Sequence, residues 1–195
     1  MKVTGQVDNS GRGAEGSGFV HGDGMVMTNA HVVAGVDRPW VRTGGVGERV
    51  PATVVLYDPG TDAAVLRVPG PDVPAVSFAG SDTMRGGSAV VAGYPQNGGL
   101  DLRAATVAAR MDATGLDIYD ASTVTRDVHQ LRATVRPGNS GGPLLTTDGQ
   151  VYGMVFARSS AHPDTGYALA ADELRALADQ GARADGPVEA RVVSS

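Results

Sequence analysis

The 195-residue chain contains no cysteine. This absence excludes disulfide bonds, a thiolate nucleophile and zinc or iron–sulfur centres ligated by cysteine. It does not decide the compartment, because exported domains of this size can fold without disulfides. The chain also has a single lysine, Lys2, so it cannot contain a Walker A loop, which requires a lysine directly after its glycines.

Positive charge is scarce as well. Sixteen Lys and Arg residues stand against 21 Asp and Glu residues, which gives a net charge of −5 at pH 7. Nucleic-acid partners and anionic membrane surfaces are therefore disfavoured, since both require a basic patch. No apolar run approaches the ~20 residues that span a bilayer, and residues 1–6 lack the apolar stretch of a signal peptide. The chain as given is expected to be a soluble domain.

Aromatic residues make up only 5% of the chain, whereas glycine occurs 28 times. Short valine-rich segments between glycine and proline turns indicate an all-β fold, a sandwich or a barrel. They cover residues 18–20, 25–28, 50–57, 63–68, 88–93, 102–111, 128–135 and 151–157. One helix is predicted near the end, at 172–180, with acids in its first turn and Gly181 as its cap.

Two patterns that could bind a cofactor or metal fail on context. Residues 11–16 fit G-x-G-x-x-G, but a β-like segment follows where a dinucleotide site needs a helix, so a flexible turn is expected. The histidines are widely spaced and form no H-E-x-x-H pair; they are His21, His31, His129 and His162. No cofactor and no metal are expected.

The segment from Arg136 to Leu144 reads R-P-G-N-S-G-G-P-L and has the features of a nucleophile turn. An acyl-transfer serine needs an exposed hydroxyl on a bent backbone, with neighbouring amide N–H groups facing the same side. The glycines on both sides of Ser140 allow that bend, and Gly138 can adopt a positive φ. A tight turn between two strands fits the same letters.

A serine nucleophile needs a base and an orienting acid. His31 follows a β-like segment, and Asp62 opens an apolar run where a carboxylate would need hydrogen-bond donors. Asp58, on the preceding turn, is the competing acid. The α/β-hydrolase order requires an acid and then a histidine after the serine, and only His162 follows Ser140, so the histidine–acid–serine order of the chymotrypsin type fits better.

The strings T-N-A-H-V-V, T-D-A-A-V-L and G-N-S-G-G-P-L, in this order, resemble trypsin-like serine proteases, including the bacterial HtrA type. Further stretches are similar to the MarP-type membrane-anchored periplasmic serine proteases of actinobacteria. They comprise residues 27–35, 93–95, 117–119, 124–128 and 165–173.

The resemblance implies two six-stranded antiparallel β-barrels with a C-terminal helix. The first barrel is expected at about 1–95, the second barrel and helix at 96–182, and a tail at 183–195. Ser140 is implied as nucleophile, His31 as general base and then acid, and Asp62 as the group that orients the imidazole. The N–H groups of Gly138 and Ser140 would form the oxyanion hole, and peptide bonds would be cleaved through an acyl-enzyme without a cofactor.

The resemblance also implies a substrate site. Thr134 would lie at the base of the pocket for the P1 side chain, so a small or medium neutral P1 residue is expected. Val155, Phe156 and Ala157 would pair with the substrate backbone, and Arg158 replaces a glycine of digestive relatives. The partner would be a polypeptide, including the chain itself if the polar stretch 112–125 is a cleavable loop.

The MarP-type likeness further implies a missing N-terminal membrane anchor, a periplasmic or other extracytoplasmic location, and a role in acid stress. Two other functions fit the same residues: a protease fold that binds peptides without cleaving them, and an esterase that uses the same three side chains.

Overall fold

The computed structural model describes residues 1–7, 12–70, 73–80 and 85–191. Its first half is built from two four-stranded sheets, in the orders β2-β1-β5-β6 and β3-β4-β8-β7. The strands are β1 (Lys2–Val7), β2 (Arg12–Ser17), β3 (Phe19–Gly22), β4 (Met25–Thr28), β5 (Trp40–Arg42), β6 (Val50–Pro51), β7 (Thr53–Asp58) and β8 (Ala63–Arg67). A short 3₁₀ turn, η1 (Thr43–Gly45), follows β5.

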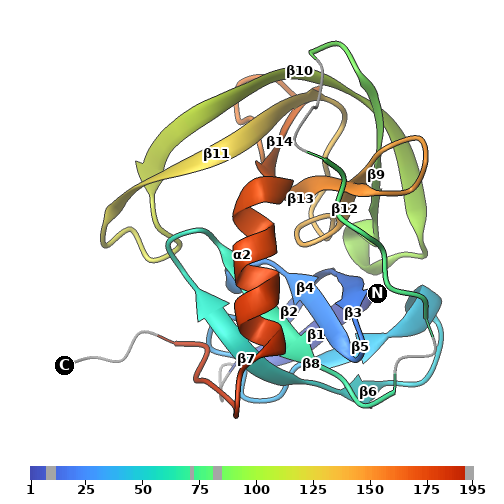
Figure 1. Ribbon diagram of the computed structural model, residues 1–195, viewed down its shortest axis with the longest axis vertical. Coiled ribbons are helices and arrows are strands. Elements are labelled where there is room, and N and C mark those ends of the chain that lie inside the picture. The colour runs from blue at the N-terminus through green and yellow to red at the C-terminus, as the bar shows by residue number, and fades with distance from the viewer. Residues whose placement is uncertain (8–11, 71–72, 81–84, 192–195) are drawn as a thin grey trace.

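The second half is a closed six-stranded barrel in the order β10-β11-β14-β13-β12-β9. Its strands are β9 (Ser88–Gly93), β10 (Asp101–Leu116), β11 (Thr123–Arg132), β12 (Pro143–Leu145), β13 (Val151–Arg158) and β14 (Thr165–Ala170). The turn η2 (Pro95–Asn97) follows β9. Strands β10 and β11 extend past the barrel as a long antiparallel hairpin that descends toward the first half (Figure 1).

The helix α2 (Ala171–Ala182) connects the two halves. It continues directly from β14 and runs down to β7 and β8, so that it lies against both sheet systems (Figure 1). Its side chains Leu174 and Ala178 enter the same core as Val65 of β8 and Leu169 of β14. Because this core draws on both halves, their relative position is fixed by apolar burial.

The prediction of an all-β protein with two barrel-like halves and a C-terminal helix is confirmed. The first half, however, is a pair of four-stranded sheets rather than one closed six-stranded barrel. Strand β9 (Ser88–Gly93), which precedes the boundary expected near residue 95, is a strand of the closed barrel.

Gly181 was wrongly assigned as the helix cap. The helix continues to Ala182, and Arg183 is its C-cap. A Cβ at Gly181 would lie only 2.8 Å from three side-chain carbons of Val65, so this glycine lets the helix approach β8.

Other short-range expectations also needed tertiary context. The region expected as a turn at 11–16 contributes residues 12–16 to β2, and Gly11 lies outside the described residues. The expected loop at 112–125 is mostly strand, with residues 117–122 as its tip. The expected tail is anchored as far as residue 191: Val188 N–H donates to Val54 O at 2.9 Å, and Gly35 N–H donates to Ala190 O at 2.6 Å.

Candidate active site

His31 lies on α1 (Ala30–Val33), a single helical turn directly after β4. Ala30, Val32 and Val33 are buried in the first half, so the remaining residue of the turn, His31, faces outward. The His31 side chain is accordingly 38% exposed, whereas that of Asp62 is 5% exposed. The site thus pairs an accessible imidazole with a buried carboxylate.

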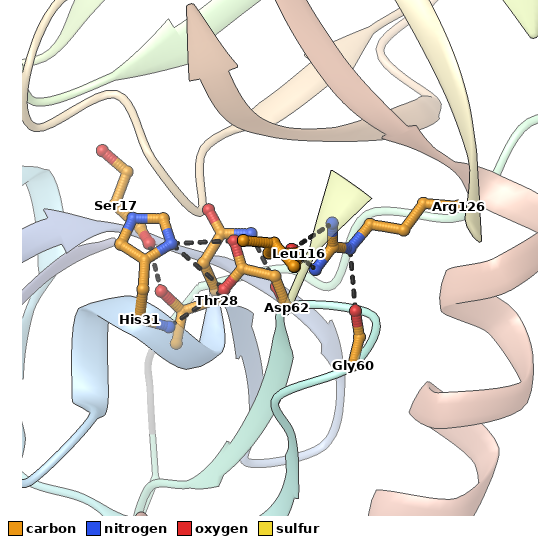
Figure 2. A network of polar contacts seen from close by, with 8 residues as sticks. Ser17, Thr28, His31, Gly60, Asp62, Leu116 and Arg126 are labelled. Atoms are coloured by element: carbon orange, nitrogen blue, oxygen red, sulfur yellow. Dashed lines mark hydrogen bonds and ion pairs between the residues drawn. The ribbon is translucent and has the colours of Figure 1, made fainter. Parts of the chain in front are cut away.

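Asp62 precedes β8 and adopts a φ of 65°, which turns its side chain toward α1. Its Oδ1 accepts the His31 backbone N–H at 2.9 Å, and Oδ2 and Oδ1 lie 2.8 and 3.0 Å from His31 Nδ1 (Figure 2). An ionised carboxylate can only accept, so Nδ1 carries a proton and a neutral ring keeps the lone pair of Nε2 free.

Asp58, the competing acid, binds within its own turn. Its Oδ1 accepts the Thr61 N–H at 3.1 Å, and its Oδ2 accepts the Thr61 hydroxyl at 2.9 Å. The structure therefore places Asp62, and not Asp58, against the histidine. The Asn29 side-chain amide adds a further link, since it donates to the Asp62 carbonyl at 2.8 Å.

Ser140 directly follows a four-residue turn, residues 136–139, which we call the serine turn and which has the pattern of a type II turn. Asn139 N–H donates to Arg136 O at 3.0 Å, and the third turn residue, Gly138, has a φ of 94°. Pro137 O accepts the Gln96 N–H at 2.9 Å. Because N–H and C=O of a trans peptide point in opposite directions, the Gly138 N–H faces away from Gln96.

Glycines bring Ser140 next to α1. A Cβ on Gly16 would lie 2.7 Å from Val32 side-chain atoms and 3.0 Å from Ser140 O, so the backbone of Gly16 separates the helix from the serine turn by one chain width. Ser17 N–H donates to Ser140 O at 2.8 Å. Within the described part of the chain, the Ser140 hydroxyl makes no hydrogen bond to His31, and the N–H groups of Gly138 and Ser140 donate to no protein atom.

The residues expected to bind substrate lie just after β11, at Thr134, and in the second half of β13, at residues 155–158. Thr134 is exposed, and its hydroxyl lies 3.4 Å from Asp164 Oδ1, a carboxylate that sequence reasoning missed because it is remote along the chain. Both backbone groups of Val155, expected to pair with substrate, are bonded within the protein: its N–H donates to Gly142 O at 2.9 Å, and its C=O accepts the Gly141 N–H at 2.8 Å.

The remaining expected residues, Phe156, Ala157 and Arg158, form the end of β13. The pairing of β13 with β14 skips Phe156, because the register shifts between Val155 and Ala157. Arg158 is exposed. At this end of β13 the regular antiparallel pairing with β14 is therefore interrupted, and Phe156 has no partner residue on β14.

Among the described residues, no group of three or more His, Asp or Glu side chains has an arrangement that could hold a metal ion. The same residues include no helix with the length and apolar character needed to cross a membrane. Two histidines outside the site, the half-buried His21 and the buried His129, have shifted pKa values. Burial lowers the pKa of His21 and of His129, in the latter case with help from the nearby Arg110 cation.

Residues 16–154 match the family model described as the trypsin-like peptidase domain. The chain is 44% identical to the serine protease Rv3671c of Mycobacterium tuberculosis over 82% of its length, and 36% identical to a protein of Chlamydia pneumoniae named as a DegP-like periplasmic serine endoprotease over 89%. It spans about 40% and 35% of the length of these relatives. The crystal structure of the active form of Rv3671c matches with a TM-score of 0.93 and 38% identity, over 100% of this chain and 85% of that one. The chain belongs to the trypsin-like peptidase domain family of serine proteases, and it is similar to the MarP protease Rv3671c.

Proposed function

We propose that the chain is a serine endopeptidase that cleaves peptide bonds through an acyl-enzyme. The observation that carries this proposal is the pairing of His31 Nδ1 with the Asp62 carboxylate at 2.8 Å. It lies next to the serine turn, where the N–H groups of Gly138 and Ser140 donate to no described protein atom. In this scheme Ser140 Oγ attacks the carbonyl carbon while His31 Nε2 takes the hydroxyl proton. The buried Asp62 stabilises the imidazolium that forms.

The N–H groups of Gly138 and Ser140 would receive the negative charge that develops on the substrate oxygen. His31 then returns its proton to the leaving amine, which departs and leaves an ester on Ser140. A water molecule attacks this ester with His31 again as base, and the acid product and free serine are released. No cofactor enters this sequence of steps.

The end of β13 supports an extended peptide as substrate. The skipped residue Phe156, followed by Ala157 and Arg158, offers backbone for pairing with a substrate strand. Thr134 at the pocket base favours a small or medium neutral P1 side chain. A peptide library tests this preference, and strong selection of Arg or Lys at P1 would instead assign Asp164 as an anionic pocket floor.

The relatives suggest where such a protease acts. DegP-like relatives are named periplasmic, and this supports a periplasmic or extracytoplasmic location for the present chain. Membrane anchoring in the parent protein and a role in acid resistance follow from the similarity to MarP-type proteases and belong to the same proposal.

Self-cleavage is a further part of the proposal. The tip of the β10–β11 hairpin, residues 117–122, is the candidate site, since the flanking residues are held in strands. Mass spectrometry of wild-type protein beside Ser140→Ala tests this directly. Fragments that end within 117–122 and appear only in the wild type are expected, and intact wild-type protein after prolonged incubation would contradict it.

A fluorophosphonate probe together with matched peptide and ester substrates separates the three functions. An endopeptidase is labelled on Ser140 and cleaves peptides. An esterase is labelled but cleaves only the esters. A peptide-binding scaffold is not labelled, although it binds peptide in the folded state.

A further inference from the structure

Ser17 is the last residue of β2, and it is 1% exposed between the two halves of the molecule. All of its polar groups are hydrogen-bonded. The N–H donates to Ser140 O at 2.8 Å, and the hydroxyl donates to Gly138 O at 2.7 Å. The same hydroxyl accepts the Tyr94 N–H at 2.9 Å, and the Ser17 carbonyl accepts the Thr28 hydroxyl at 2.7 Å.

Two of the residues that Ser17 contacts in the second half, Gly138 and Ser140, are bonded through their carbonyl oxygens. These are also the residues whose N–H groups would bind the oxyanion under the proposed function. Ser17 donates hydrogen bonds to the carbonyl oxygens of both residues, and their N–H groups remain available to bind an oxyanion. One residue of the first half thus holds both ends of the stretch 138–140, Gly138 through its side-chain hydroxyl and Ser140 through its backbone N–H.

Such fixing matters because Gly138 is free to change conformation. A glycine accepts positive and negative φ, so the peptide between Pro137 and Gly138 can rotate and replace the inward N–H with a carbonyl oxygen. The Gln96 N–H donates to Pro137 O at 2.9 Å and holds this peptide directly, while the Ser17 hydroxyl donates to Gly138 O at 2.7 Å and holds the next peptide, between Gly138 and Asn139.

Ser17 also supports the first of these bonds. Its hydroxyl accepts the N–H of Tyr94, which directly precedes the η2 turn containing Gln96. Within η2, Gln96 and Asn97 have φ values of 53° and 59°, a conformation that non-glycine residues adopt at a cost. A fixed start of this turn helps keep the Gln96 N–H aimed at Pro137.

We propose that Ser17 is a positioning residue, whose hydroxyl keeps the turn at 136–140 in the form that presents both N–H groups to the reacting carbonyl. This inference rests on the proposed function. Ser17 touches no reacting atom, so its removal should weaken transition-state stabilisation and leave the binding of an uncleaved peptide largely intact.

The test compares Ser17→Ala with wild type in steady-state hydrolysis of a good peptide substrate. We expect kcat to fall about 10²-fold, the size of losing one oxyanion donor, with KM changed by less than about threefold. Affinity for a peptide boronate or aldehyde, which forms a tetrahedral adduct, should fall in parallel with kcat, while affinity for a product peptide should not.

Ser17→Cys keeps the shape with a weaker donor and is expected to fall between alanine and wild type; this second variant also decides the case if the alanine variant does not fold. Thr28→Val is the matched control, because it removes another fully buried hydroxyl that donates to the Ser17 carbonyl and not to the serine turn. Its kcat should stay within about threefold of wild type.

Three results overturn the proposal: a Ser17→Ala variant with wild-type kcat, a loss confined to KM, or an equal loss of kcat in Thr28→Val. Failure of the proposed function gives a different result. In that case wild-type protein itself cleaves no peptide and takes no fluorophosphonate label.

Discussion

Arg126 Nε donates to the carbonyl oxygen of Gly60 at 2.8 Å, so a strand of the second barrel holds the turn that leads to Asp62 in the first half (Figure 2). The same guanidinium donates from Nη1 and Nη2 to Leu116 O at 3.2 Å, which ties the end of β10 to the same point. Arg126 is 8% exposed. This buried cation thus links the β10–β11 hairpin to the turn before Asp62, the carboxylate that contacts His31.

The first prediction concerns this link. Arg126→Met should lower the free energy of unfolding by about 2 kcal/mol, because two carbonyl oxygens lose a charged donor. Chemical denaturation measures the change. Arg103→Met is the control, since Arg103 pairs with Asp101 on the surface and its removal should leave the melting temperature unchanged. Equal stability of both variants would show that the Gly60 link does not contribute.

The second prediction concerns Ser140. Replacement by alanine should lower kcat by a factor on the order of 10⁶, because the residual rate comes only from substrate binding and the N–H donors. Circular dichroism and the melting temperature should stay close to wild type, since the Ser140 hydroxyl forms no hydrogen bond within the described residues. Peptide hydrolysis at an unaltered rate would remove the proposed nucleophile.

The third prediction separates the two candidate acids. Asp62→Asn should reduce kcat by about 10⁴, because an amide can present its NH₂ group to Nδ1 and stabilise the wrong tautomer of His31. Asp58→Asn changes a residue that binds only Thr61 within its turn, so its kcat should remain within about tenfold of wild type. A larger loss in Asp58→Asn than in Asp62→Asn would reverse the assignment.

The sequence was sufficient for the strands with local apolar patterns. Met25–Thr28 and Ser88–Gly93 were predicted with their observed bounds, because a valine-rich run between turn residues has few alternatives to a buried strand. Strands β1 and β2 were missed, since their glycines lower strand propensity and only pairing with each other and with β5 stabilises them. Here tertiary contacts override a local preference.

The candidate site shows the same division. Spacing and chain order were enough to nominate His31, Asp62 and Ser140, because each lies in a short sequence motif that indicates its chemical role without tertiary contacts. Ser17, Asp164 and Arg126 could not be nominated in this way. Their importance arises from contacts with residues 30 to 121 positions away, which no local pattern contains.

The fourth prediction concerns the helix. Gly181→Ala should lower the free energy of unfolding, even though alanine favours a helix more than glycine does. The added methyl group would lie 2.8 Å from the Val65 side chain, so α2 must move away from β8 or Val65 must shift. A loss of about 1–3 kcal/mol is expected by denaturant titration. Gly13→Ala is the control, because its Cβ would meet no atom within 4 Å.

The fifth prediction is the dependence of stability on pH. His21 lies on β3 near the Phe78 ring, and burial lowers its pKa although Asp179 on α2 partly opposes the shift. His129 on β11 is 1% exposed, and burial and the Arg110 cation lower its pKa against the opposing charges of Asp127 and Asp172. Nε2 of His21 and Nδ1 of His129 have no hydrogen-bond partner in the described structure.

A lowered pKa in the folded state means that the unfolded chain binds more protons just below pH 6.5, the ordinary histidine value. Stability from these two residues is therefore complete above pH 6.5 and declines as the pH falls below it, by up to about 1.4 kcal/mol per pH unit for each proton. Denaturant titrations between pH 7.5 and 5 measure this slope. His129→Gln should reduce it, and His162→Gln, which removes an exposed histidine, is the matched control. If the His129→Gln variant has the same slope as wild type, protonation of His129 does not destabilise the fold in acid. Burial of His129 would then place no limit on the proposed role in acid stress.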